Sequence, residues 1–303
     1  MDKSFVVNVP VATIWTSHDS PRELDQQAVS YPANIEGWIK SLSHDQLLDL
    51  CNHNLVQTQV LLGQKVEIIS EHGEWVEVII PEQPSSKQER GYPGWMPKRQ
   101  LTEVADWDVE QSPLISVIKQ TAWLYDDENQ PLLHVSFQTR LPVVEESGTY
   151  IRVQIPQGTA RVKKEDITFL RSLKELPIGR GEGIVGAGKA FIGLPYLWGG
   201  MSGFGFDCSG FSYTMCKANG IMIARDAHDQ AASGESVPFH QLKPGDLLFF
   251  AYEEGKGKLH HVGIYCGNGE MIHAPQTGKG IEVIELKGTI YEKELCHASR
   301  YWK

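Results

Sequence analysis

The sequence lacks a long hydrophobic run. No stretch approaches the roughly eighteen consecutive apolar residues that a bilayer-spanning helix needs. Residues 1–10 also lack the apolar core and the small-residue cleavage site of a secretory leader. We therefore expect a cytoplasmic protein with no membrane partner.

Cysteine is scarce, and its few positions show no pairing pattern. The five cysteines are Cys51, Cys208, Cys216, Cys266 and Cys296, and none belongs to a Cys-x-x-Cys pair. An odd, scattered set argues against a disulfide-stabilised secreted scaffold and against a zinc framework. We expect free thiols in a reducing compartment, with no metal and no cofactor.

Basic residues are outnumbered by acidic ones. Lys plus Arg total 28 against 38 for Asp plus Glu, so the formal net charge is −10. This balance argues against nucleic acid as a main partner and against attraction to an anionic membrane or cell wall. The 303 residues, 41% of them hydrophobic, are instead typical of a soluble globular protein with two or three domains.

Two stretches of the first half follow one pattern, 75 positions apart. Val66, Ile68, Gly73, Trp75, Val76, Val78, Ile80 and Pro81 are matched by Leu141, Val143, Gly148, Tyr150, Ile151, Val153, Ile155 and Pro156. Alternation with a period of two and a glycine turn predicts two similar β units. Residues 35–51 have helical spacing and form an expected insertion, which a capping box of Ser43 and Gln46 would divide into two short helices.

The last third of the chain has helical patterns first and strand patterns after them. Residues 184–192 predict a helix, whereas 260–265 and 270–274 predict two strands joined by a turn at 267–269. This is an α+β order. The expected domains are 1–106, a β unit with the helical insertion; 107–172, the second β unit; and 173–303, the α+β domain.

A glycine-rich loop ends at Cys208, and helical spacing begins there with Phe211 and Met215. Unpaired N–H groups and the positive end of the helix dipole would then face the thiol. Both favour the thiolate, so we expect a lowered pKa and a nucleophilic cysteine. The other four cysteines are better interpreted as small buried hydrophobes.

A cysteine nucleophile needs a base, and the base needs an orienting group. His261 and His273 lie on the two strands of the predicted hairpin, where His261 shares a face with Gly263. If both faces point to Cys208, one histidine is the base and the other its orienter. Either histidine alone would more often be structural.

Six motifs, in order, resemble those of the NlpC-type peptidoglycan cysteine peptidases over about residues 180–300. They lie at 195–200, 206–211, 225–230, 243–250, 261–265 and 271–275. The resemblance implies a papain-like core that cuts γ-D-glutamyl or related bonds in wall peptides. It assigns Cys208 as nucleophile, His261 as base and His273 as third member. Tyr196 matches the tyrosine that helps the Cys208 backbone N–H hold the oxyanion, although it could instead pack against Trp198.

The two preceding β units resemble tandem bacterial SH3-like domains. The expected fold is therefore α+β, a papain-like NlpC-type catalytic domain preceded by two small SH3-like β barrels. The pair also resembles the recycling branch of the family, the YkfC-like γ-D-glutamyl-L-diamino-acid dipeptidyl-peptidases, which remove L-Ala-γ-D-Glu from short murein peptides. We expect an architectural role for the SH3-like units, with wall-polymer binding as the alternative.

One departure from the family pattern concerns the residue after Arg225. The family commonly continues with Thr-Ser, whereas this chain has Asp226 and Ala227. A carboxylate in the cleft suits a free α-amino group, so we assign Asp226 to the N-terminus of a small murein peptide that begins with free L-Ala. Asp226 could also cap the helix that follows it.

Further candidates for substrate contact lie in or beside the motifs. They are Trp198, Asp207, Ser209, Arg225 and His260, with Tyr92 as a candidate for contact across the domain boundary. Asp207 could instead only cap the Cys208 helix, and Tyr92 could only pack within its β unit.

These assignments predict a monomeric cysteine peptidase of free murein peptides. It would hydrolyse the bond from γ-D-glutamate to L-lysine or diaminopimelate and release L-Ala-γ-D-Glu. The alternatives are an endopeptidase acting on the intact wall, a non-catalytic wall-binding module with a degenerate fold, and an acyltransferase or amidase on a related core.

Overall fold

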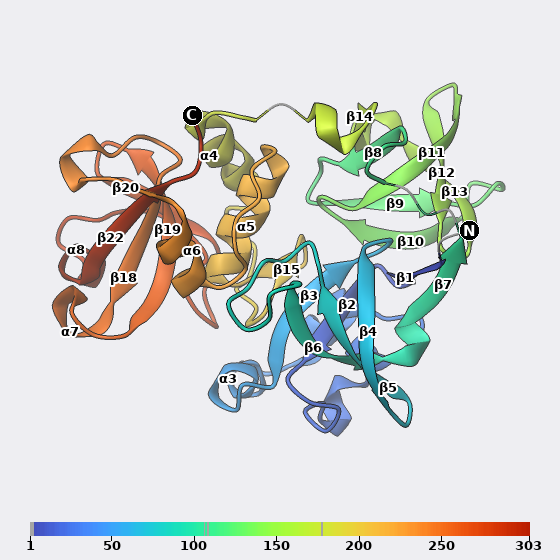
Figure 1. Cartoon of the computed structure of the whole chain (residues 1–303), viewed down its shortest axis with the longest axis horizontal. Coiled ribbons are helices and arrows are strands. Elements are labelled where there is room, and N and C mark those ends of the chain that lie inside the picture. Colours follow the sequence, from blue (N-terminus) through green and yellow to red (C-terminus); the bar gives the residue numbers. More distant parts are fainter. Residues whose placement is uncertain (1–2, 106, 108, 177) are drawn as a thin grey trace. The chain divides into compact units, whose positions relative to one another are not determined.

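A computed structural model describes residues 3–105, 107, 109–176 and 178–303 (Figure 1). The chain divides into two compact units. Unit 1 comprises Met1–Glu82, Arg90–Leu176 and Ser202–Phe204, and unit 2 comprises Gln83–Glu89, Pro177–Met201 and Gly205–Lys303. The expected division into three domains stays a prediction.

The first sheet of unit 1 has seven strands in the order β3-β2-β6-β5-β4-β1-β7. They are β1 (Lys3–Val7), β2 (Val11–Trp15), β3 (Val56–Leu61), β4 (Lys65–His72), β5 (Trp75–Ile80), β6 (Tyr92–Pro97) and β7 (Leu101–Ala105). Alternate residues of β5, Val76, Val78 and Ile80, enter one hydrophobic cluster, as a period of two requires. The sheet is therefore built around the predicted apolar alternation.

Short helices lie between β2 and β3. They are α1 (Gln26–Val29), α2 (Ile35–Ser41) and α3 (His44–Asn52). The Ser43 hydroxyl accepts from the Gln46 amide at 3.3 Å, and the Gln46 side chain accepts from the Ser43 amide at 2.9 Å. This reciprocal pair confirms the predicted capping box and the division of the insertion into two helices.

The second sheet of unit 1 repeats the first. Its strands are β8 (Leu114–Val117), β9 (Thr121–Tyr125), β10 (Pro131–Ser136), β11 (Arg140–Ser147), β12 (Tyr150–Ile155), β13 (Gly158–Lys163) and β14 (Ile167–Leu170). Their order is β10-β9-β13-β12-β11-β8-β14, which is the first order with seven added to each strand number. The predicted internal repeat is therefore confirmed at the level of topology.

Unit 2 has its main helices first and its sheet after them. The helices are α4 (Gly181–Lys189), α5 (Cys208–Ala218) and α6 (Ala227–Ser233), followed by α7 (Tyr252–Gly255) and α8 (Ile290–Glu294). The strands are β17 (Glu235–Ser236), β18 (Leu247–Ala251), β19 (Leu259–Gly267), β20 (Glu270–His273), β21 (Glu282–Glu285) and β22 (Leu295–Arg300), in the order β17-β22-β18-β19-β20-β21. A two-stranded piece, β15 (Met201–Ser202) with β16 (Gly205–Phe206), precedes α5.

The packing of α5 sets the position of Cys208. This helix lies against β19 on one side and α4 on another. It has 11 residues. Within the described part of the chain, no helix is both long and apolar enough to cross a bilayer. The α+β order predicted for this part of the chain is confirmed, with α4 beginning three residues earlier than expected.

Candidate active site

The predicted hairpin is present and brings His261 and His273 together. Strands β19 and β20 pair antiparallel, with Ile264 opposite Ile272. That register sets His273 beside Gly263 and leaves His261 on the diagonal, within reach of a long side chain. The His261 Nε2 atom lies 2.7 Å from the His273 Nδ1 atom. The two imidazoles therefore form one hydrogen-bonded pair.

Gly263 makes room for this diagonal contact. A Cβ atom at Gly263 would lie 2.7 Å from the sulfur of Met271 and 3.4 Å from the Cβ of His273. Met271 and His273 are both fully buried, so neither has free space to retreat into. The missing side chain at position 263 thus lets the two histidines meet.

Cys208 is the first residue of α5, as predicted, and its side chain is half-buried. Asp207 is the N-cap of this helix and accepts from the Gly210 amide at 2.6 Å. The same carboxylate accepts from the Gly199 amide at 3.0 Å. Gly199 has a φ of +74°, a conformation that favours glycine. One side chain therefore fixes both the loop before the thiol and the helix after it.

The expected lowering of the Cys208 pKa is wrong. Burial raises the pKa of this thiol to about 12, and the Asp207 carboxylate acts in the same direction. Backbone hydrogen bonds from Val262 and Ser209 favour the thiolate but are outweighed. The helix N-terminus therefore offsets only part of the cost of a buried negative charge, and the resting sulfur is a thiol.

His261 is a neutral imidazole at neutral pH. Burial lowers the pKa of this imidazole well below its ordinary value, and the neighbouring His273 and His260 lower it further. A neutral imidazole is a proton acceptor, whereas an imidazolium is not. The site at rest thus contains a neutral thiol and a neutral imidazole, and their roles as nucleophile and base stay predictions.

Two residues near the histidines were missed in the sequence. The Tyr291 ring lies 5.3 Å from the His261 ring and 5.1 Å from the His273 ring, centroid to centroid. Burial raises the pKa of Tyr291 to about 12. The second is Glu282, with 3.7 Å between its Oε1 atom and the His273 Nε2 atom. The available signal for Glu282 was the group of β-branched residues Ile281, Val283 and Ile284 around it, which is typical of a strand.

Arg225, Asp207 and Ser209 form one buried network. The Arg225 guanidinium lies 2.6 Å from an Asp207 oxygen and donates to the Ser209 hydroxyl at 2.8 Å. The Gln230 amide nitrogen donates to the backbone carbonyls of Ser209 and Ala224 at 3.0 and 2.9 Å. These bonds tie the start of α5 to the start of α6. Contact of these three residues with substrate stays a prediction.

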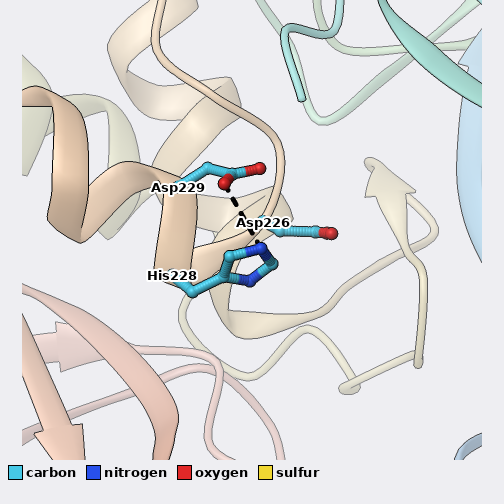
Figure 2. A group of neighbouring side chains, drawn as sticks. All are labelled: Asp226, His228 and Asp229. Carbon is cyan, nitrogen blue, oxygen red and sulfur yellow. Dashed lines mark ion pairs between the residues drawn. The ribbon is translucent and has the colours of Figure 1, made fainter. Parts of the chain in front are cut away.

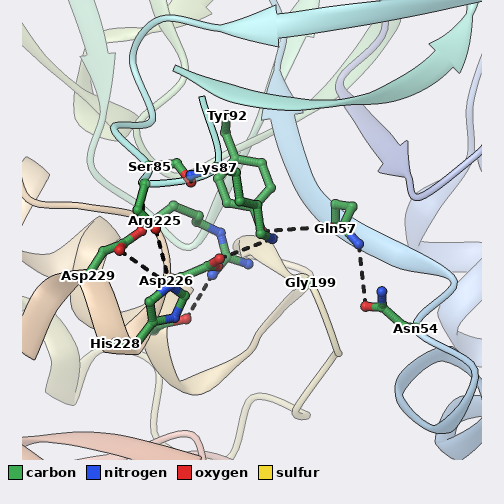
Figure 3. Close-up of polar contacts among 12 residues, drawn as sticks. Asn54, Gln57, Ser85, Lys87, Tyr92, Gly199, Arg225, Asp226, His228 and Asp229 are labelled. Carbon is green, nitrogen blue, oxygen red and sulfur yellow. Dashed lines mark hydrogen bonds and ion pairs between the residues drawn. The ribbon is translucent and has the colours of Figure 1, made fainter. Parts of the chain in front are cut away.

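Asp226 is the N-cap of α6, but its side chain makes no capping hydrogen bond. The alternative capping role is therefore not realised. Its Oδ2 atom instead lies 3.1 Å from the ammonium nitrogen of Lys87 (Figure 3). The segment that carries Lys87 is held on α6: the Arg225 amide donates to the Pro84 carbonyl at 3.0 Å, and the Ser86 amide donates to Asp229 at 2.9 Å. The carboxylate assigned to a substrate ammonium thus already binds an ammonium group.

A potential metal-ligand group surrounds Asp226. Ligand atoms of Asp226, His228 and Asp229 lie within 4.8 Å of one another (Figure 2). Protein donors already occupy these oxygens, because Asp226 pairs with Lys87 and Asp229 accepts from the Ser86 amide. Exposed acidic groups are common without a metal, and we assign none here.

Three of the remaining predicted site residues, Tyr196, Trp198 and His260, lie in unit 2. The Tyr196 side chain is buried, and its backbone pairs with Phe206 just before the thiol. Trp198 is half-buried in the glycine-rich loop. His260 lies 3.0 Å from a Glu294 oxygen.

Tyr92 lies in unit 1. It is buried in β6, and its hydroxyl donates to Gln57 at 3.4 Å (Figure 3). The predicted contacts of Tyr92, Tyr196, Trp198 and His260 with substrate stay predictions.

Comparison with known proteins agrees with this site. The NlpC/P60 family matches residues 193–300, and the YKFC SH3b2 domain matches residues 117–169. The chain is 49% identical, over 96% of each chain, to the gamma-D-glutamyl-L-lysine dipeptidyl-peptidase of Bacillus subtilis (strain 168). It is 42% identical to the enzyme of the same name from Bacillus cereus (strain ATCC 10987 / NRS 248), over 99% of this chain and 91% of that one.

A solved structure agrees as well. The crystal structure of an NlpC/P60 family protein from Bacillus cereus ATCC 10987 superposes with a TM-score of 0.95 at 42% identity, over the whole of both chains. An SH3b-type domain is thereby established for the second sheet, whereas the two-barrel arrangement stays a prediction. With near-complete coverage at this identity, the chain belongs to the NlpC/P60 family.

Proposed function

We propose that this protein is a cysteine peptidase that hydrolyses the bond from γ-D-glutamate to L-lysine or diaminopimelate in free murein peptides, releasing L-Ala-γ-D-Glu. The observation that carries the proposal is the hydrogen-bonded His261–His273 pair, together with a thiol at the start of α5 that hydrogen-bonds the backbone of Val262, the residue after His261. It occurs in a chain that is 49% identical to a gamma-D-glutamyl-L-lysine dipeptidyl-peptidase. An intact Cys–His–His set weighs against a degenerate wall-binding module.

The chemistry follows from the protonation states at rest. His261 takes the proton from Cys208 as the sulfur attacks the carbonyl carbon of the γ-glutamyl amide. The Cys208 backbone N–H and the Tyr196 hydroxyl bind the oxyanion of the tetrahedral intermediate. His261 then gives its proton to the amine of the leaving diamino acid, and a thioester remains. Water, deprotonated by His261, hydrolyses that thioester and frees the dipeptide.

Asp226 gives the enzyme its preference for a free N-terminus. The pair with Lys87 supports this role, since it places a cation 3.1 Å from the carboxylate in the protein itself. A free α-amino group is an ammonium at neutral pH and would bind in the same way. Binding of the first residue's ammonium by Asp226 would limit cleavage to the bond that follows the second residue of the peptide.

The proposal extends to the organisation of the chain and its location. We assign residues 1–106 and 107–172 to two SH3-like domains, because the two sheets share one strand order. A monomer in the cytoplasm is the expected state. All five cysteines are free thiols in the structure, which suits a reducing compartment.

The direct test uses L-Ala-γ-D-Glu-L-Lys and its diaminopimelate form. Mass spectrometry should detect L-Ala-γ-D-Glu and the free diamino acid with the unaltered protein, and neither with Cys208→Ala. Cys266→Ala, which removes another half-buried thiol, is the matched control and should retain turnover. Turnover by Cys208→Ala would refute the assigned nucleophile. Release of soluble fragments from intact peptidoglycan would favour the wall endopeptidase instead.

A further inference from the structure

We propose that Glu282 is a positioning residue that sets the tautomers of both histidines, so that His261 presents an unprotonated nitrogen to the Cys208 thiol. The inference deepens the proposed function and relies on its cysteine–histidine chemistry. It does not depend on which peptide is cleaved.

The first step concerns the direction of the hydrogen bond between the rings. His261 uses Nε2 toward His273, so Nδ1 is the ring nitrogen left to accept the thiol proton. A neutral imidazole carries one hydrogen. If Nδ1 of His261 is unprotonated, the ring hydrogen of His261 is on Nε2 and is donated to Nδ1 of His273. His273 must then carry its own hydrogen on Nε2.

The second step concerns that hydrogen on His273. The His273 side chain is fully buried, and its Nε2 atom has no hydrogen-bond partner among the residues that the structure describes. A buried N–H without an acceptor is unfavourable. Without an acceptor, the opposite tautomer becomes competitive, in which His273 donates through Nδ1 to His261. His261 would then carry its hydrogen on Nδ1, the nitrogen that has to accept from the thiol.

Glu282 is placed to supply the acceptor. Strands β20 and β21 pair antiparallel with His273 directly opposite Glu282, so the two side chains share a face of the sheet. The Glu282 Oε1 atom lies 3.7 Å from Nε2, and the carboxylate is 41% exposed and so has room to move. A shift of roughly 1 Å produces an ordinary hydrogen bond, and catalytic hydrogen bonds commonly tighten when substrate binds.

Other charged and titratable groups also face this pair. Lys279 lies near His273 and opposes a positive charge on it, whereas the Tyr291 ring packs on both imidazoles. His260, which pairs with Glu294, is near His261. Among these groups, Glu282 is the carboxylate aligned with the outer nitrogen of His273. With Glu282, the proposed series of hydrogen bonds is complete. The thiol donates to Nδ1 of His261, and Nε2 of His261 donates to Nδ1 of His273. Nε2 of His273 then donates to the Glu282 carboxylate.

The test compares Glu282→Gln with Glu282→Leu. Glutamine keeps an oxygen acceptor without the charge, whereas leucine removes both. We expect Glu282→Leu to lower kcat roughly tenfold with little change in KM, and Glu282→Gln to retain most of kcat. Both variants should move the acid and alkaline limbs of the pH profile to lower pH, because losing a negative charge lowers the pKa of nearby groups. Glu285→Leu, an exposed position on the same strand, is the matched control and should change neither.

A second readout separates this inference from the proposed function. The rate of Cys208 alkylation by iodoacetamide against pH reports on the thiol and its base without any peptide substrate. The same shift to lower pH in both Glu282 variants supports the positioning role even if the peptide assignment fails. Unaltered alkylation and kcat profiles in Glu282→Leu would overturn it. The inference would also be overturned if both variants lost kcat equally, with a lowered Tm and no shift in the limbs of the pH profile. That outcome would indicate a structural role for Glu282.

Discussion

The Arg225 guanidinium and the Asp207 carboxylate form a buried ion pair, with 2.6 Å between Nη2 and Oδ2. Asp207 immediately precedes Cys208, and its two oxygens also accept from the Gly199 and Gly210 amides. Because these hydrogen bonds complete the charge pairing, the pair can be held in the interior at low cost. It fixes the backbone on both sides of Cys208.

Removing Arg225 should therefore destabilise the protein strongly. Arg225→Met leaves the Asp207 carboxylate buried without its countercharge, and we expect a loss of about 3–5 kcal/mol. Urea denaturation measures it, with Lys98→Met as the control because its pair with Glu71 is exposed and contributes at most about 1 kcal/mol. A loss below that of the control would contradict the interpretation.

The Asp226→Asn substitution should slow the cleavage of peptides with a free N-terminus and leave the cleavage of N-terminally blocked peptides unchanged. The amide keeps the size of the side chain but loses its charge, so a charge-assisted contact with the substrate ammonium is lost. We expect kcat/KM for L-Ala-γ-D-Glu-L-Lys to fall about tenfold to a hundredfold. We expect the N-acetylated tripeptide to be a poor substrate and to be cut at the same low rate by both proteins. Equal cleavage of free and acetylated peptides by the unaltered enzyme would exclude this role of Asp226.

The Lys87→Met substitution should have the opposite effect and improve the binding of the free tripeptide. The Lys87 ammonium binds the same carboxylate that we assign to the substrate, so substrate has to compete with it. Removing the competitor should lower KM for the free tripeptide about threefold to fivefold, in keeping with a partly exposed ion pair. Lys98→Met is again the matched control. A raised KM would instead mean that Lys87 helps to bind the peptide.

Acid should destabilise the fold through His273. Burial first and the charge of Lys279 second lower the pKa of His273 to about 4, from an ordinary 6.5. The unfolded chain therefore binds the proton more readily in this window, so the stability present above pH 6.5 is lost as the pH falls toward 4. We expect this residue alone to lower the free energy of unfolding by about 2 kcal/mol when the pH falls from 7 to 5. Urea denaturation at pH 7 and pH 5 should show a smaller difference in the free energy of unfolding for His273→Gln than for the unaltered protein. An equal difference in the two proteins would contradict this role of His273.

Local patterns predicted the helix start and the hairpin that carry the candidate catalytic residues. The change of period at Cys208 marked the start of α5, and the glycine-flanked turn at Asn268 marked the hairpin that carries the histidines. What escaped prediction depends on packing between distant segments. The Ser86–Asp229 bond joins residues 143 positions apart, and no periodicity encodes it. The pKa of Cys208 likewise follows from its burial, which helix position alone does not reveal. Glu282 was missed because β21 has only four residues, with a glutamate at each end.

The assignment of residues 83–89 to unit 2 limits how this protein can be divided. Arg225 and Asp229 each hydrogen-bond the backbone of this segment, which lies between β5 and β6 in the sequence. Residues 178–303 expressed alone would lack those partners and the Lys87 ammonium. Unit 2 is thus incomplete without a short segment that the chain supplies between two strands of the first sheet. A cut before residue 178 would keep Cys208 and both histidines but lose the segment whose Lys87 pairs with Asp226.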